Sequence, residues 1–109
     1  MDYESIILKI ITHSGEAKSL CMEAIKYSKQ GEIQKGRDCI EEAKQKLVLA
    51  HEVQTSLIQS EARGEKIEVS LLVVHAQDHL MNSMTVKDLA QEFIDLYSKV
   101  QRIESKVEQ

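Results

Sequence analysis

Two histidines and an aspartate lie at helical spacing inside the most apolar stretch of this chain, residues 69–84. They are His75, Asp78 and His79. On a helix that advances about 100° per residue, His79 lies about 40° to one side of His75 and Asp78 about 60° to the other. All three therefore share one face of a helix. Because burying an ionisable side chain costs free energy unless partners satisfy it, this cluster is the candidate functional site.

Three kinds of chemistry fit this cluster. A neutral imidazole has a free nitrogen near neutral pH and can accept a phosphoryl group. His75 and His79 also have the i,i+4 spacing of a zinc-binding pair, and His-x-x-Asp-His differs by one methylene from the inverted zincin motif of a zinc hydrolase. For that site the chain offers no obvious third ligand, since His13 and His51 qualify only by residue type. In the third alternative, the protein is a helical interaction scaffold in which these side chains only hydrogen-bond one another.

The composition favours a single helical domain. The 109 residues include no proline, no tryptophan and only four glycines, and this length is enough for one domain with a core. A formal net charge of −4 argues against binding to nucleic acid, which needs a basic face. The chain has neither a long apolar run nor a signal peptide, so we expect a cytoplasmic protein without direct membrane insertion. Cys21 and Cys39 are expected to be reduced packing residues.

Apolar residues recur at steps of three and four along three segments. These segments predict helices at about 3–30, 32–63 and 70–105. Gly31 and Gly64 follow the first two segments as helix-ending residues, and Ser70 is a suitable N-cap for the third. Helices of this length joined by short loops must fold back as an antiparallel up-down-up bundle. We therefore expect an all-α protein in which residues 1–109 form one domain.

Some helical residues carry more local expectations. Gly15 interrupts the first predicted helix at a cost of about 1 kcal/mol relative to alanine, and we expect it to pack against a neighbouring backbone. Glu42 with Lys46, and Asp95 with Lys99, have the spacing of solvent-exposed i,i+4 ion pairs. Both pairs are expected to lie on the solvated outer faces of single helices.

The third predicted helix has more apolar surface than a three-helix bundle can bury. Besides the line through His75 and Asp78, it presents Val73, Leu80 and Met84 on another side. Such a wide apolar surface has to be buried against a further partner. A closed homo-oligomer that packs third helix on third helix is the economical solution, and Asp78 would then lie near its symmetry axis.

The residues around the cluster resemble a known family. Val69-Ser-Leu-Leu-Val-Val-His-Ala-Gln-Asp-His-Leu-Met is similar to the active-site helix of the lactose/cellobiose-type enzyme IIA proteins of the bacterial sugar phosphotransferase system. The similarity covers nearly the whole chain, and its other segments are residues 14–19, 50–59, 61–65, 84–89 and 96–97. The His-Ala-Gln-Asp-His core with these flanks is a specific motif.

The resemblance implies a phosphotransferase component that assembles as a homotrimer, a nine-helix bundle. In this reading His75 accepts a phosphoryl group from the phosphocarrier HPr and passes it to a cysteine of the cognate IIB component, while the membrane IIC component imports the sugar. The flanking residues favour cellobiose or chitobiose over lactose. Asp78 and its two symmetry mates would bind one Mg²⁺ on the trimer axis, which fits the need of converging carboxylates for a cation with oxygen ligands.

The neighbours of His75 have less specific roles. Gln77 is expected to hydrogen-bond the imidazole or its phosphate, or else to be an ordinary exposed side chain. His79, one turn along the same face, is a candidate to orient His75 or to help neutralise the phosphate. We expect His13 and His51 to be structural histidines.

Overall fold

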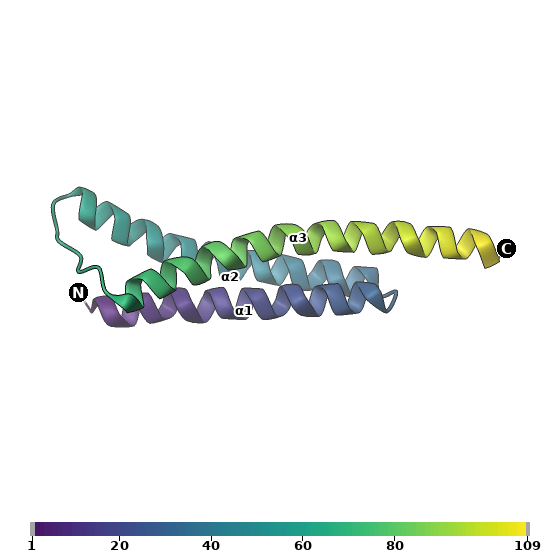
Figure 1. The fold of residues 1–109 in the computed structure, drawn as a ribbon, viewed down its shortest axis with the longest axis horizontal. Helices are drawn as coiled ribbons and strands as arrows, with labels where there is room; N and C mark the ends of the chain where they lie inside the picture. Colours follow the sequence, from purple (N-terminus) through teal and green to yellow (C-terminus); the bar gives the residue numbers. More distant parts are fainter. Residues whose placement is uncertain (1, 109) are drawn as a thin grey trace.

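The computed structural model describes residues 2–108 as three α-helices. They are α1 (Tyr3–Lys29), α2 (Ile33–Ala62) and α3 (Leu71–Glu108). Helices α1 and α2 form an antiparallel hairpin, and α3 runs back along the hairpin in the direction of α1 (Figure 1). The predicted all-α, three-helix fold is therefore confirmed. The molecule measures 65 × 20 × 19 Å, and it is this long because α3 continues past the turn between α1 and α2 (Figure 1).

The predicted capping residues define where the helices begin and end. Gly31 and Gly64 follow α1 and α2 with φ of 87° and 92°, in the left-handed region that glycine adopts without steric strain. Ser70 precedes α3, and its hydroxyl accepts a hydrogen bond of 3.2 Å from the backbone N–H of Val73. The prediction of Ser70 as an N-cap is confirmed.

Helices α1 and α2 approach each other closely through small side chains. A Cβ atom on Gly36 would lie 2.9 Å from the carbonyl oxygen of Ala24 and 2.3 Å from the hydroxyl of Ser28. Only a glycine fits this contact without displacing the α1 backbone. The other small buried residues of the two helices are Ser14, Ala17, Cys21, Ala43, Ala50 and Ser60.

Helix α3 closes the core and is tied to α1 by a buried hydrogen bond. Leu80 and Ile94 are its largest fully buried side chains. The hydroxyl of Ser83 lies 2.9 Å from the carbonyl oxygen of Ser14 in α1 and 2.8 Å from that of His79, so it can donate to either acceptor. This contact joins α3 to α1 one turn beyond the candidate cluster.

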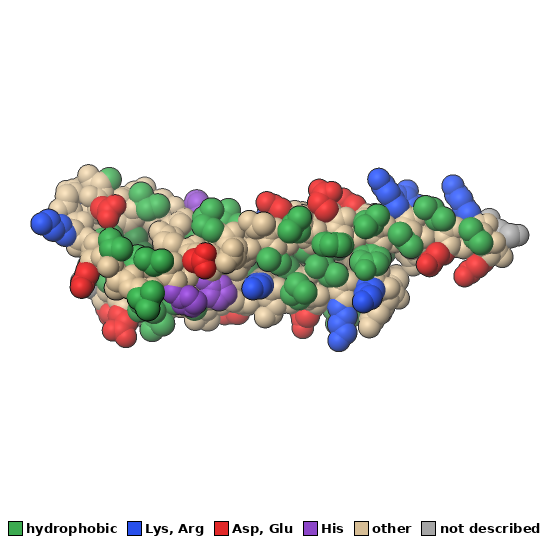
Figure 2. Space-filling view, viewed as in Figure 1, with side chains coloured by type: hydrophobic (Ala, Val, Ile, Leu, Met, Phe, Trp, Pro, Cys, Tyr) green, Lys and Arg blue, Asp and Glu red, His purple; other side chains and the backbone are tan. Residues whose placement is uncertain are grey.

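The outer face of α3 remains apolar and exposed in the single chain. Its exposed large hydrophobic side chains are Leu71, Val74, Met81, Leu89, Phe93, Leu96, Val100, Ile103 and Val107. Figure 2 shows hydrophobic side chains in green along α3 towards the C-terminal end of the molecule. A surface of this extent usually marks an interaction site. Within residues 2–108, no helix is long and apolar enough to cross a membrane.

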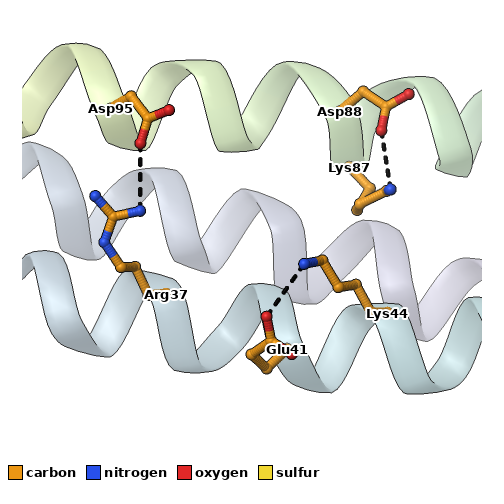
Figure 3. Close-up of polar contacts among 6 residues, drawn as sticks. All are labelled: Arg37, Glu41, Lys44, Lys87, Asp88 and Asp95. Atoms are coloured by element: carbon orange, nitrogen blue, oxygen red, sulfur yellow. Dashed lines mark hydrogen bonds and ion pairs between the residues drawn. The ribbon is translucent and has the colours of Figure 1, made fainter.

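The prediction that Glu42 pairs with Lys46, and Asp95 with Lys99, is wrong. The ammonium group of Lys46 lies 2.9 Å from Glu16 of α1, rather than pairing with Glu42 of its own helix. Asp95 of α3 accepts a hydrogen bond of 3.2 Å from Arg37 of α2 (Figure 3). These side chains are long enough to reach the adjacent helix, so they connect helices that sequence spacing treats separately.

Candidate functional site

The two histidines of the cluster contact each other on the surface of α3. Their ring centroids lie 5.6 Å apart and the rings are inclined by 69°, an edge-to-face arrangement. His75 is exposed, whereas His79 is half-buried. Figure 2 shows histidine side chains in purple at this surface, next to an acidic side chain in red. An approaching group can therefore reach the ring of His75, while the ring of His79 is enclosed on more sides.

Gly15 of α1 lies next to the ring of His79. A Cβ atom on Gly15 would be 3.9 Å from both Cε1 and Nε2 of that imidazole. The expectation that Gly15 packs against a neighbouring backbone is wrong, because the nearest group is a side chain. The close backbone approach occurs instead at Gly36. Sequence spacing along α3 gave no sign that α1 contributes a residue to the histidine pair.

Asp78 is exposed on α3 beside the histidine pair. Within residues 2–108 there is no group of three or more His, Cys, Asp and Glu side chains placed to bind one metal ion. His75, Asp78 and His79 of one chain are therefore not placed to bind one zinc ion together, as the zinc-hydrolase alternative requires. The carboxylate oxygens of Asp78 do suit a hard cation such as Mg²⁺, provided that other copies of the chain supply further ligands.

Gln77 connects α3 to α2 immediately beside the cluster. Its side-chain oxygen accepts a hydrogen bond from the amide of Gln54. We did not predict Gln54 as part of this region. The available signal was its place in the apolar stripe of α2, where a polar side chain needs a polar partner.

The two remaining histidines lie on α1 and α2. The Nδ1 atom of His13 is buried without a hydrogen-bond partner and lies 3.9 Å from Glu16. The hydrogen bond from Lys46 holds the pKa of Glu16 below its usual value, and the same bond raises the pKa of Lys46. His51 is exposed and lines a groove between α2 and α3 with residues that include Met84.

An exposed imidazole on a three-helix chain, flanked by a second imidazole and a carboxylate, agrees with the family that the sequence resembles. Residues 5–98 match the family of the phosphotransferase system (PTS) described as lactose/cellobiose-specific IIA subunits. The chain belongs to this family. It is an enzyme IIA component of the phosphotransferase system and takes part in sugar transport of the cellobiose/lactose type.

Individual relatives cover almost the full length of the chain. It is 52% identical to the lichenan-specific phosphotransferase enzyme IIA component of Bacillus subtilis over 91% of this chain and 90% of the relative. A crystal structure of the cellobiose-specific enzyme IIA from Bacillus anthracis matches with a TM-score of 0.91 and 51% identity over 94% of both chains. The chitobiose IIA of Escherichia coli, solved in complex with HPr, matches with a TM-score of 0.81 and 39% identity over 93% of this chain and 98% of that chain.

Proposed function

We propose that His75 is the phosphoryl acceptor of this enzyme IIA. The observation that carries the proposal is the exposure of its imidazole, beside the half-buried His79, on a chain of the IIA family. A neutral imidazole nitrogen forms a bond to phosphorus as the bond to the donor breaks, and the reverse exchange releases the group to the next carrier. Such a relay needs in-line positioning and charge screening more than further catalytic groups.

The donor in this proposal is phospho-HPr, and the acceptor is the cysteine of a cognate IIB component. A relative with the same fold has been solved in complex with HPr, which supports HPr as the donor. Relatives of the chain at 52% and 51% identity are named for lichenan and cellobiose. We therefore assign the chain, as one IIA domain spanning residues 1–109, to the uptake of a cellobiose- or chitobiose-type disaccharide through a membrane IIC component.

The working assembly that we propose is a homotrimer built around α3. The exposed apolar face of α3 supports it, because a single chain leaves that face uncovered. Asp78 shares the face, and three copies would bring three carboxylates together. Asp78 and its symmetry mates would hold one Mg²⁺, and the ion would supply the positive charge that such a buried acidic group needs.

The function is tested by incubating the protein with phosphorylated HPr and analysing the bound phosphate. We expect one acid-labile, base-stable phosphate per chain, as phosphohistidine requires, and none on His75→Ala. His79→Ala is the matched control and is expected to retain the phosphate, at a lower rate of formation. A phosphorylated His75→Ala protein would transfer the acceptor role to His79, and absence of phosphate from the wild-type chain would leave only the scaffold alternative.

A further inference from the structure

Gly15 of α1 lies beside the histidine pair, and it has no side chain on the side that faces His79. A Cβ atom there would make ordinary contact with His79, at 3.9 Å from two atoms of the ring. A longer side chain would place a further carbon atom beyond that Cβ. If that atom pointed towards α3, it would enter the space that the imidazole of His79 occupies. The ring of His79 therefore lies between Gly15 on one side and the ring of His75 on another.

The distance between Gly15 and α3 is held by neighbouring buried groups. Ser83 donates its hydroxyl proton towards the carbonyl oxygen of Ser14, the residue before Gly15, or towards that of His79. Ser14 and Ser83 are both fully buried. Because this contact lies so close to the pair, movement of α3 away from Gly15 would disrupt the buried contact between the Ser83 hydroxyl and the Ser14 carbonyl oxygen. A larger residue at position 15 would thus displace the mobile group, which is the half-buried ring of His79.

We propose that Gly15 is a positioning residue for phosphoryl transfer. Its missing side chain forms the recess that holds the ring of His79, and the edge-to-face contact of His79 then orients the ring of His75. The inference rests on His75 being the phosphoryl acceptor. Gly15, which has no polar side chain, would then control the direction in which the reacting nitrogen of His75 points.

Two substitutions separate the recess from other effects of this glycine. Gly15→Ala adds only the Cβ atom that fits at 3.9 Å, whereas Gly15→Leu adds three further carbon atoms. Alanine and leucine are both much better helix formers than glycine, so a difference between the two variants cannot come from helix propensity. Ser19→Leu places the same side chain one turn further along α1 at an exposed position and serves as a surface control.

The experiment combines single-turnover transfer from phospho-HPr with NMR of the imidazole protons. We expect Gly15→Leu to slow transfer by about tenfold or more with little change in the KM for phospho-HPr, because a small displacement of a reacting group costs rate rather than affinity. Gly15→Ala should be faster than Gly15→Leu, and Ser19→Leu should transfer like the wild type. The cross-relaxation signal between the rings of His75 and His79 should persist in Gly15→Ala and disappear in Gly15→Leu.

A double-mutant cycle identifies His79 as the intermediary. In a His79→Ala background there is no ring for the leucine to displace, so Gly15→Leu should cause no further loss of rate. Additive losses, or equal rates for Gly15→Ala and Gly15→Leu, would overturn the proposal. Failure of the wild type to become phosphorylated at His75 would instead refute the proposed function, and the ring-to-ring NMR signal would still decide whether Gly15 forms the recess.

Discussion

At the scale of single residues, the surroundings decide the chemistry of chemically identical groups. His75 and His79 are the same residue type on the same face of α3, yet one is exposed and the other is held against Gly15. The two cysteines show the same dependence. Cys21 is fully buried, and burial raises the pKa of its thiol to about 11, whereas Cys39 is only partly buried. Burial thus makes Cys21 unreactive near neutral pH.

Because the pKa of Cys21 is raised, the stability of the fold should decrease as the pH becomes alkaline. The pKa of this thiol in the folded protein is above its ordinary value of 9.0, so the contribution to stability is fully present below about pH 9 and is lost as the pH rises to about 11. We expect the free energy of unfolding to fall over this range by up to about 2–3 kcal/mol more in the wild type than in Cys21→Ala. Urea titrations at several pH values measure this difference.

The Cys21→Ala comparison removes the contribution of lysines, which also titrate in this range and are present in both proteins. Parallel curves for the two proteins would show that the thiol of Cys21 ionises as easily in the folded state as in the unfolded chain. Alkylation gives an independent check, because a buried protonated thiol should react with iodoacetamide more slowly than Cys39 until the protein unfolds.

At the scale of helices, one glycine determines how closely α1 and α2 pack. Gly36 faces the carbonyl oxygen of Ala24 at a distance that leaves no room for a methyl group. The hydroxyl of Ser28 can rotate away from an added atom, but a backbone carbonyl cannot move without its helix. The small residues around this point therefore bring the two helices close together along much of the hairpin.

Substitution of Gly36 by alanine should force α1 and α2 apart. The added Cβ would lie 2.9 Å from the Ala24 carbonyl oxygen, so we expect a loss of about 1–3 kcal/mol in the free energy of unfolding, partly offset by higher helix propensity. Gly15→Ala is the matched control, since it has the same propensity gain and a permissive contact at 3.9 Å. Urea denaturation should rank Gly15→Ala above the wild type and Gly36→Ala below it. Equal stabilities of the two variants would contradict the close approach at Gly36.

At the scale of the whole molecule, the uncovered face of α3 is the dominant feature. Helix α3 extends past the hairpin (Figure 1). Its exposed apolar side chains continue to Val107. Leu96 follows Asp78 by eighteen residues, which is about five full turns, so both lie on the same side of α3. If the copies of the chain packed against one another through this side of α3, the contact would bury its exposed apolar side chains and bring the Asp78 carboxylates together.

Two substitutions on this side of α3 should have opposite effects on the proposed trimer. Leu96→Glu introduces a charge into an apolar contact and should yield monomers of 12.4 kDa in analytical ultracentrifugation. Asp78→Leu should keep or strengthen the trimer and abolish metal binding, because an apolar core can replace a buried ionic one. Metal analysis of the wild type should find about one Mg²⁺ for three chains. A monomeric Asp78→Leu protein would refute the axial position of Asp78.

The sequence by itself determined the local organisation of this protein. The repeat of apolar residues specified three helices, Gly31, Gly64 and Ser70 marked their ends, and His75 and His79 were placed on one face of the third. These features follow from backbone geometry within a few residues of each position. The motif around His75 was also sufficient to indicate the family, which the match over residues 5–98 then showed.

Only the tertiary structure decided which side chains meet across helices. It placed Gly15 against His79, and it paired Gln54 with Gln77 and Arg37 with Asp95. Spacing within one helix cannot predict such contacts, because they depend on how far the helices are shifted and rotated against each other. That alignment is set by the shape of the whole interface, where a single small residue such as Gly36 allows the backbones to approach.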